Sequence, residues 1–168
     1  MEPSFVIFIL FLIALRLIEL YISGRNEKWL LSQGAIEYGR GHYPFVVALH
    51  TSFIILLVVE FFLSNAPHQI SYPFLALFII LLLFKWWLMS SLGKYWNTKI
   101  YRIPGSIAVK KGPYKFIRHP NYVDVVCEIA FIPLVFHLYY TAVIFSILNA
   151  VMLTVRIKEE NSVWADRK

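Results

Sequence analysis

The side chains best suited to chemistry lie in one stretch, Gly112–Tyr122 (Gly-Pro-Tyr-Lys-Phe-Ile-Arg-His-Pro-Asn-Tyr), and in the apolar run that follows it. Arginine and histidine can form charge-assisted hydrogen bonds with an anion, and tyrosine offers a hydroxyl and a π face. The following run adds two carboxylates, Asp124 and Glu128. Because these are four residues apart, both can project from one face of a helix.

A second charged group, Arg156–Glu160, follows the last apolar run, and its terminal arginine and glutamate can also share a helix face. The runs Tyr122–Leu138 and Tyr139–Val155 meet within the short stretch His137–Thr141, which is the only connection between them. We therefore expect a tight antiparallel helical hairpin. The hairpin predicts a site for a ligand of mixed charge, formed by Arg118, His119, Tyr122, Asp124, Glu128, Asn149, Arg156, Glu159 and Glu160.

The composition places this site in an integral membrane protein. Of the 168 residues, 59% are hydrophobic and only 15% are charged, whereas about a quarter are charged in soluble proteins. The net charge of +6 comes from Lys and Arg clustered between apolar runs. This pattern is typical of a cytosolic membrane face and not of a nucleic-acid-binding surface. We expect one all-α membrane domain over residues 1–168, with no nucleic-acid partner and no metal site.

Five apolar runs predict five transmembrane helices: residues 3–22, 44–63, 72–92, 122–138 and 139–155. The connecting loops carry three, zero, seven and zero Lys and Arg residues in chain order. The positive-inside rule then places the N-terminus outside, and the C-terminus and the site in the cytosol. Residues 1–92 supply three spans, and residues 93–168 supply the binding loop, the hairpin and the C-terminal tail.

Several ionisable side chains in or beside these spans have no assigned role. Arg16 and Glu19 are three residues apart, so they form either a structural ion pair or part of a polar cavity. His50 is either a functional group or forms a hydrogen bond to a neighbouring helix. Lys85 lies late enough in its span to reach the interface and needs no catalytic role. The function of His42 is equally open.

Two motifs, in this order, resemble a known family. Gly112-Pro113-Tyr114, Arg118-His119-Pro120-Asn121-Tyr122 and Glu128, followed by Arg156-x-x-Glu159-Glu160, are similar to the C-terminal signature of the isoprenylcysteine carboxyl methyltransferase family. The resemblance covers about residues 90–163, and Leu92-Gly93-Lys94-Tyr95-Trp96 is similar to a piece found in bacterial members. It implies a methyltransferase of the short bacterial type, in the cell membrane, with S-adenosylmethionine as methyl donor.

The resemblance also implies roles for residues. Arg118 or His119 can pair with the donor's carboxylate, and Glu159 or Glu160 can accept from its amino group or ribose hydroxyls. A tyrosine ring can cover its adenine or its methyl-sulfur centre. The catalytic candidates are Arg156, which would orient the acceptor's oxygen, Glu160, and His119 if a base is needed. The donor-binding candidates are Tyr114, Arg118, His119, Pro120, Tyr122, Glu128, Glu159 and Glu160.

The implied acceptor is a lipophilic molecule methylated on a carboxylate or an acidic hydroxyl, such as a prenylcysteine or an alkylpyrone-type lipid. Two alternatives keep the same residues. Phospholipid N-methyltransferases and membrane sterol reductases have similar C-terminal regions. A non-catalytic membrane protein could instead use the basic stretch Lys94–Arg118 to bind anionic lipid.

Overall fold

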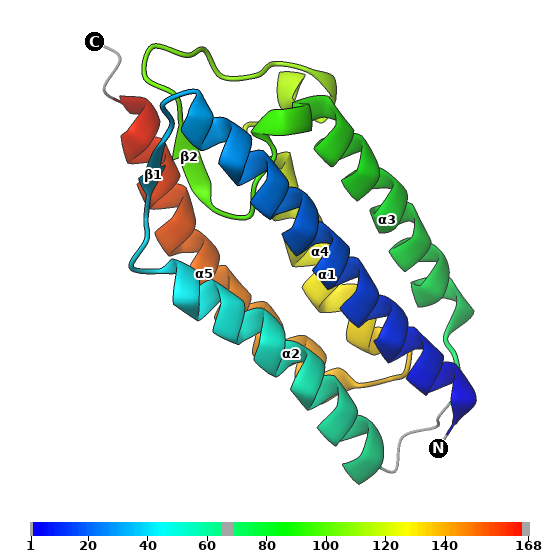
Figure 1. The fold of residues 1–168 in the computed structure, drawn as a ribbon. Coiled ribbons are helices and arrows are strands. Elements are labelled where there is room, and N and C mark those ends of the chain that lie inside the picture. Colours follow the sequence, from blue (N-terminus) through cyan, green and yellow to red (C-terminus); the bar gives the residue numbers. More distant parts are fainter. Residues whose placement is uncertain (1, 65–68, 166–168) are drawn as a thin grey trace.

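The computed structural model describes residues 2–64 and 69–165, and these form five helices and a short two-stranded ribbon (Figure 1). Successive helices run in opposite directions, so the ends of α1, α3 and α5 lie near the start of α4. Two 3-10 helices, η1 and η2, lie at the same end. The bounds are α1 Pro3–Ser32, α2 Tyr43–Leu63, α3 Tyr72–Leu92, η1 Gly93–Tyr95, η2 Gly112–Lys115, α4 Pro120–Leu134 and α5 Tyr139–Ala165.

Four of the described helices, α1, α2, α3 and α5, are long and apolar enough to cross a membrane. With 15 residues, α4 measures about 22 Å, against about 30 Å for the hydrocarbon core of a bilayer. The sequence predicted a span over residues 122–138. Pro133 removes a hydrogen-bond donor near the end of α4, and His137 has a left-handed backbone (φ 59°) beyond it. The described residues thus form five α-helices, and the fourth is shorter than predicted.

The first helix is longer than the predicted first span, which ended at Ile22. It continues through Gly24 to Ser32 and has 30 residues, or about 45 Å. Polar contacts hold this end, since the Asn26 amide donates to the carbonyl oxygens of Gly93 (3.2 Å) and Trp96 (2.8 Å). The polar end of α1 therefore fixes the segment that follows α3.

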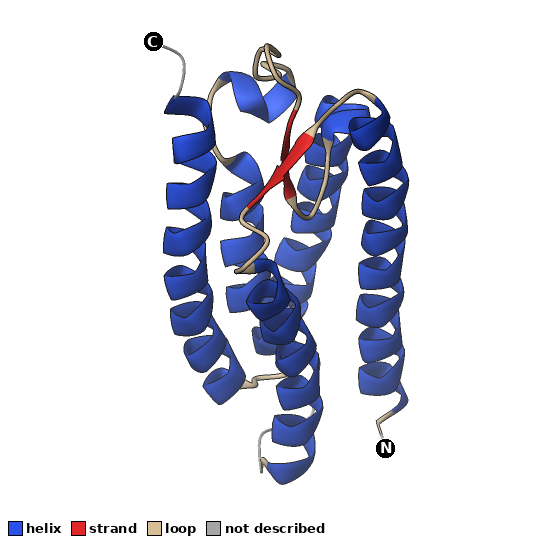
Figure 2. Ribbon diagram, turned by 60° about the vertical axis from the view of Figure 1, so that its left-hand side comes forward, coloured by secondary structure: helices blue, strands red, loops and turns tan. Residues whose placement is uncertain are grey.

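A ribbon of two strands lies across the same end of the bundle (Figure 2). β1 (Ile36–Tyr38) pairs antiparallel with β2 (Ile100–Arg102), and Glu37 lies opposite Tyr101 in the register. The ribbon joins the connection between α1 and α2 to the long segment between α3 and α4. It thereby links the two halves of the chain beside the predicted site.

The turn between α4 and α5 is buried inside the protein. Val135 and Phe136 are at most 2% exposed, and Phe136 packs edge-on against Phe5 of α1 and Phe61 of α2. Irregular backbone at membrane depth is tolerated where protein covers it. The first helices therefore form the cover that this turn requires.

A carboxylate from α2 completes the start of α5. Glu60 accepts hydrogen bonds from the backbone N–H groups of Tyr140 (3.0 Å) and Thr141 (2.6 Å). The first N–H groups of a helix have no partner within it, so this contact serves as an N-terminal cap.

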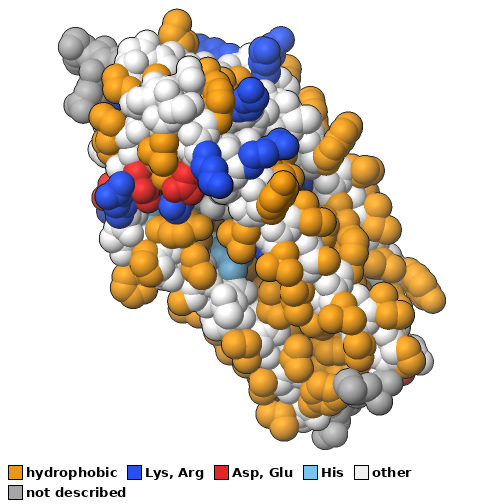
Figure 3. Space-filling view, in the orientation of Figure 1, with side chains coloured by type: hydrophobic (Ala, Val, Ile, Leu, Met, Phe, Trp, Pro, Cys, Tyr) orange, Lys and Arg blue, Asp and Glu red, His pale blue; other side chains and the backbone are white. Residues whose placement is uncertain are grey.

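Apolar side chains cover most of the surface seen in Figure 3, while charged side chains gather at the end of the bundle where the β1–β2 ribbon lies.

Candidate active site

A cavity of about 580 Å³ opens at the charged end, lined by β2, residues 103–110, η2 and the ends of α4 and α5. Its volume lies within the range of about 300–1,000 Å³ that small-molecule sites occupy. Apolar groups such as Leu30, Leu92 and Trp96 share its wall with polar ones such as Asn121 and Arg156. The cavity can therefore enclose a ligand that has both apolar and charged parts.

The hairpin brings the start of α4 against the end of α5 at the cavity wall. The Tyr122 hydroxyl donates to Glu160 Oε2 at 2.5 Å, and His119 Nδ1 lies 3.4 Å from the same oxygen. The Arg156 guanidinium lies over the Tyr122 ring, 5.6 Å from its centroid, and its Nη2 donates to the Thr98 carbonyl at 2.9 Å. Four of the predicted site side chains, from the start of α4 and the end of α5, thus meet at one point.

Proline sets the local geometry at the start of α4. Pro120 occupies the first position of the helix, where its missing N–H leaves no bond unmade. His119 lies just before the helix and Tyr122 in its first turn, and their rings stack 5.3 Å apart with 20° between their planes. The two side chains therefore face the end of α5 together.

The short helix η2 forms another part of the wall. Its first residue, Gly112, has φ 52°, and a Cβ there would lie 2.2 Å from Ser91 Oγ of α3. Glycine alone adopts this left-handed conformation at low cost and leaves room for the serine. This close approach holds η2 against α3 and places Tyr114 in the cavity wall.

Two buried hydrogen-bond donors lie at the cavity. Among the described residues, the Tyr114 hydroxyl and Arg156 Nε are buried without a hydrogen-bond partner. Burial, together with the nearby carboxylates of Glu160 and Asp124, raises the pKa of Tyr114, so its hydroxyl keeps its proton. Because buried polar groups are normally bonded, these two donors fit a ligand that brings acceptor atoms.

The charged side chains that line the cavity are mostly basic. Glu160 is the one acidic side chain among the described lining residues, and it faces six basic ones. This excess of five positive charges favours a ligand that carries negative charge. The single carboxylate can hold one cationic or hydrogen-bonding group. The basic residues are Lys99, Arg102, Lys110, Lys115, Arg118 and Arg156.

Comparison with known proteins matches the segment that supplies every described lining residue of the cavity except Leu30. The model of the isoprenylcysteine carboxyl methyltransferase (ICMT) family matches residues 74–166, which is more than half of the chain. The chain belongs to the ICMT family. The members of this family are membrane methyltransferases, and they use S-adenosylmethionine. The segments η2, α4 and α5 all fall inside the match, whereas α1, β1 and α2 lie outside it.

Two relatives match nearly the whole ICMT-family chain. It is 42% identical over 158 residues to the uncharacterized protein YpbQ of Bacillus subtilis (strain 168), covering 94% of each chain. It is 30% identical over 156 residues to an uncharacterized protein of Haemophilus influenzae (strain ATCC 51907 / DSM 11121 / KW20 / Rd), covering 92% of this chain and 91% of that one. No solved structure matches the chain significantly.

The structure divides the predicted ICMT-family site residues into two groups. Pro120 is buried and supports the wall from α4, and Glu159 is exposed outside the cavity. Asp124, Glu128 and Asn149, which the sequence placed at the same point, are buried elsewhere in the bundle. The predicted meeting point was therefore too broad. The residues that do line the cavity are Tyr114, Arg118, His119, Tyr122, Arg156 and Glu160.

Glu128 belongs to a second charged cluster, enclosed between α1, α3 and α4. Its Oε2 accepts from Lys85 Nζ at 2.5 Å and from Arg16 Nη2 at 3.0 Å. Glu19 accepts from the same two cations, at 2.9 Å and 2.6 Å. Asp124 Oδ2 lies 3.6 Å from Lys85 Nζ. Two cations thus face three carboxylates inside an apolar bundle, where an unpaired charge is costly.

The structure shows where the ionisable side chains of the predicted spans lie. Lys85 does not reach the interface, because it is 8% exposed and bound to carboxylates. Arg16 and Glu19 form the predicted ion pair and also line a cavity of about 10 Å³, the size of one water molecule. His50 Nδ1 lies 2.9 Å from the carbonyl oxygen of Val46 in its own helix, and not of a neighbouring helix.

Proposed function

We propose that this ICMT-family protein binds S-adenosylmethionine in the 580 Å³ cavity and transfers its methyl group to an oxygen of a lipophilic acceptor. The observation that carries the proposal is Glu160, the lone carboxylate among the described lining residues, bonded to Tyr122 and facing His119. A carboxylate held in this way can bind the amino group or the ribose hydroxyls of the donor.

The other cavity residues suit the remaining parts of the donor. Arg118 and His119 can pair with its carboxylate, and the unbonded Tyr114 hydroxyl can donate to a ring nitrogen or a ribose oxygen. The Tyr122 ring can cover a cationic centre with its π face. The donor supplies an electrophilic methyl group on a sulfonium sulfur, which leaves as a neutral thioether when oxygen attacks.

Alignment is the main task left to the protein. A displacement on carbon requires the attacking oxygen, the methyl carbon and the sulfur to lie in line, and positioning alone lowers such barriers strongly. Arg156 can orient the attacking oxygen, because its Nε is buried and unbonded while its Nη2 is fixed at Thr98. The apolar side chains of the wall exclude water from the same space.

The charge of the cavity favours an anionic oxygen acceptor over an amine. The excess of five positive charges among the lining residues would repel a phospholipid ammonium group and attract a carboxylate or an enolate. An acceptor that is already anionic needs no base, and His119 is placed to take a proton from one that is not. A prenylcysteine or an alkylpyrone-type lipid has the required oxygen and an apolar tail.

The surrounding helices support a site at the membrane surface. The segment 93–119 is basic and lies at one end of the helices, where exposed Trp86 and Trp87 of α3 are suited to the membrane interface. The positive-inside rule assigns this end, with the C-terminus, to the cytosol and the N-terminus to the outside. The donor would then enter from the cytosol and the acceptor from the lipid.

Binding of labelled S-adenosylmethionine to the detergent-solubilised protein tests the donor site. Glu160→Gln should weaken binding about 10-fold or more, because a hydrogen bond to a charged group contributes about 1.5–3 kcal/mol. Glu159→Gln, one residue away but outside the cavity, should bind as the wild type does. Equal affinity of the wild type and Glu160→Gln would refute the proposed site.

Transfer of label into a total bacterial lipid extract tests the chemistry. Label should appear in an ester or ether of an acidic lipid, and alkaline hydrolysis of the labelled product distinguishes these two bonds. Label on the nitrogen of phosphatidylethanolamine would instead support the N-methyltransferase alternative. A requirement for NADPH would point to reduction.

A further inference from the structure

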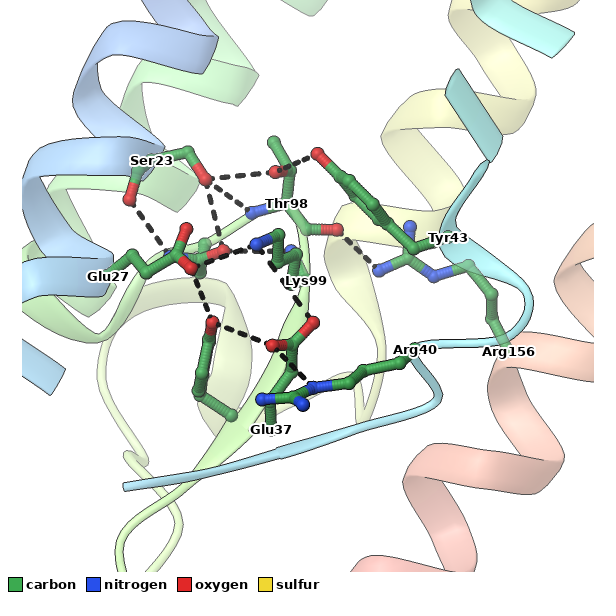
Figure 4. Close-up of polar contacts among 10 residues, drawn as sticks. Ser23, Glu27, Glu37, Arg40, Tyr43, Thr98, Lys99 and Arg156 are labelled. Atoms are coloured by element: carbon green, nitrogen blue, oxygen red, sulfur yellow. Dashed lines mark hydrogen bonds and ion pairs between the residues drawn. The ribbon is translucent and has the colours of Figure 1, made fainter. Parts of the chain in front are cut away.

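The Arg156 guanidinium is fixed at two points beside the cavity. Its Nη2 donates to the backbone carbonyl of Thr98 at 2.9 Å, and its plane lies over the Tyr122 ring. Figure 4 shows Arg156 reaching from α5 toward Thr98, which lies on the segment between η1 and β2. Because the acceptor of this bond is a backbone atom, the position of Arg156 depends on what holds the segment.

Hydroxyl groups from the first two helices hold Thr98. Ser23 Oγ of α1 accepts from the Thr98 N–H at 3.1 Å and lies 2.9 Å from Thr98 Oγ1. The Tyr43 hydroxyl of α2 lies 3.1 Å from the same Oγ1 (Figure 4). The Asn97 amide donates to the Ser23 carbonyl at 3.0 Å. The hydroxyl and the backbone carbonyl of Ser23 thus both form hydrogen bonds with this segment. Ser23 itself is 4% exposed.

The next residues are anchored as well. Lys99 Nζ donates to Glu27 Oε1 of α1 at 2.9 Å, and the Tyr101 hydroxyl donates to the same oxygen at 2.7 Å. The hydrogen bond with Glu27 raises the pKa of Lys99, so this lysine stays charged and bound at neutral pH. Glu37 Oε2 of β1 lies 3.2 Å from the same hydroxyl. Residues 97–101 are therefore tied by hydrogen bonds to α1 and to β1.

We propose that Ser23 and Tyr43 are positioning residues for Arg156 and act through Thr98. This inference rests on the proposed function, in which Arg156 orients the acceptor's oxygen. Both residues lie outside the segment matched by the family model, residues 74–166. Neither residue lines the cavity, so each would contribute to the site only through the segment that it holds.

The reactivity of Arg156 toward phenylglyoxal measures this positioning without any need for an acceptor. Modification is followed for each arginine-containing peptide by mass spectrometry. In Ser23→Ala, Tyr43→Phe and Thr98→Ala, Arg156 should react about fivefold faster, the factor that loss of one ordinary hydrogen bond produces. Thr98→Ser keeps the hydroxyl and should react as the wild type does. Tyr21→Phe removes a hydroxyl from an exposed side chain of α1 (72% exposed) and is the matched control.

Arg118 supplies an internal standard, because it is exposed at the rim of the same cavity. Its reactivity should not change in any variant, and donor affinity should stay within about twofold of the wild type. Unchanged reactivity of Arg156 in Ser23→Ala and Tyr43→Phe would overturn the inference. So would an equal rise at Arg118, which would indicate general loosening. Absence of donor binding by the wild type would refute the proposed function instead and leave the reactivity result to be judged separately.

Discussion

Replacing Lys85 with methionine tests the charged cluster inside the bundle. Lys85 Nζ lies 2.5 Å from Glu128, 2.9 Å from Glu19 and 3.6 Å from Asp124. Lys85→Met has a similar length but leaves three carboxylates with Arg16 as their one remaining cation in the cluster. Removal of one partner from a buried ion pair costs about 3–5 kcal/mol.

The expected loss corresponds to a decrease of roughly 6–20 °C in Tm for a chain of this size. Cys127 provides the assay, because it is the single cysteine of the chain, half-buried, and adjacent to Glu128 in α4. A thiol-reactive fluorophore will label it as α4 separates from its neighbours on heating in detergent. The reaction therefore reports directly on the helix that carries the cluster.

Two further variants decide how the result is read. Lys111→Met removes an exposed lysine outside the cavity and should leave Tm within about 2 °C, since exposed charges contribute little. Lys85→Met combined with Glu128→Gln removes one cation and one anion, and should regain part of the lost stability. If Lys85→Met unfolds at the same temperature as Lys111→Met, the cluster does not stabilise the bundle and the reasoning is wrong.

Three more predictions can be measured by the same labelling assay. Glu60→Gln should cost about 1.5–3 kcal/mol, because it weakens the bonds to the backbone N–H groups at the start of α5. Gly112→Ala should cost at least about 1–2 kcal/mol, because alanine disfavours a positive φ and its Cβ would collide with Ser91; Gly41→Ala, with open space around it, is the control. Burial and the charge of Arg156 lower the pKa of His42 below its ordinary 6.5, so the unfolded chain takes up this proton first. Stability should therefore fall as the pH drops through about 6.5, and less in His42→Gln; an equal fall in both proteins would contradict this.

The helical hairpin could be predicted because its signals are local. Two apolar runs with a five-residue connection leave few alternatives to antiparallel packing, and this places Tyr122 near Glu160. The resemblance of the motifs rests on residues of the same region. The structure adds the distances and shows which of the two adjacent carboxylates, Glu159 and Glu160, faces the cavity.

The neighbours of Glu128 could not be predicted in the same way. Spacing places Asp124 and Glu128 on one face of α4, but the element that this face meets depends on how α1 and α3 pack. Both helices carry apolar residues around their whole circumference, so the apolar pattern of their sequences does not reveal an inward face. The position of Lys85 within an apolar run was the available signal, since an ionisable group within a span needs a partner.

Thr98 gave no signal at all. Its contact with Arg156 uses a backbone carbonyl, which every residue possesses, and its own hydroxyl is held by residues from two distant helices. Contacts of this kind depend on the path of an irregular segment. Neither periodicity nor residue type predicts such a path, and the structure is needed to find it.

The buried turn between α4 and α5 also bears on how the protein is made. Phe136 of this turn packs against Phe5 and Phe61, and the first N–H groups of α5 are bound by Glu60. These partners come from α1 and α2, which leave the ribosome first. Until they are in place, insertion of the hairpin would expose unpaired backbone groups to lipid. We expect biogenesis to follow chain order, so that a protein lacking residues 3–32 fails to protect the hairpin from protease.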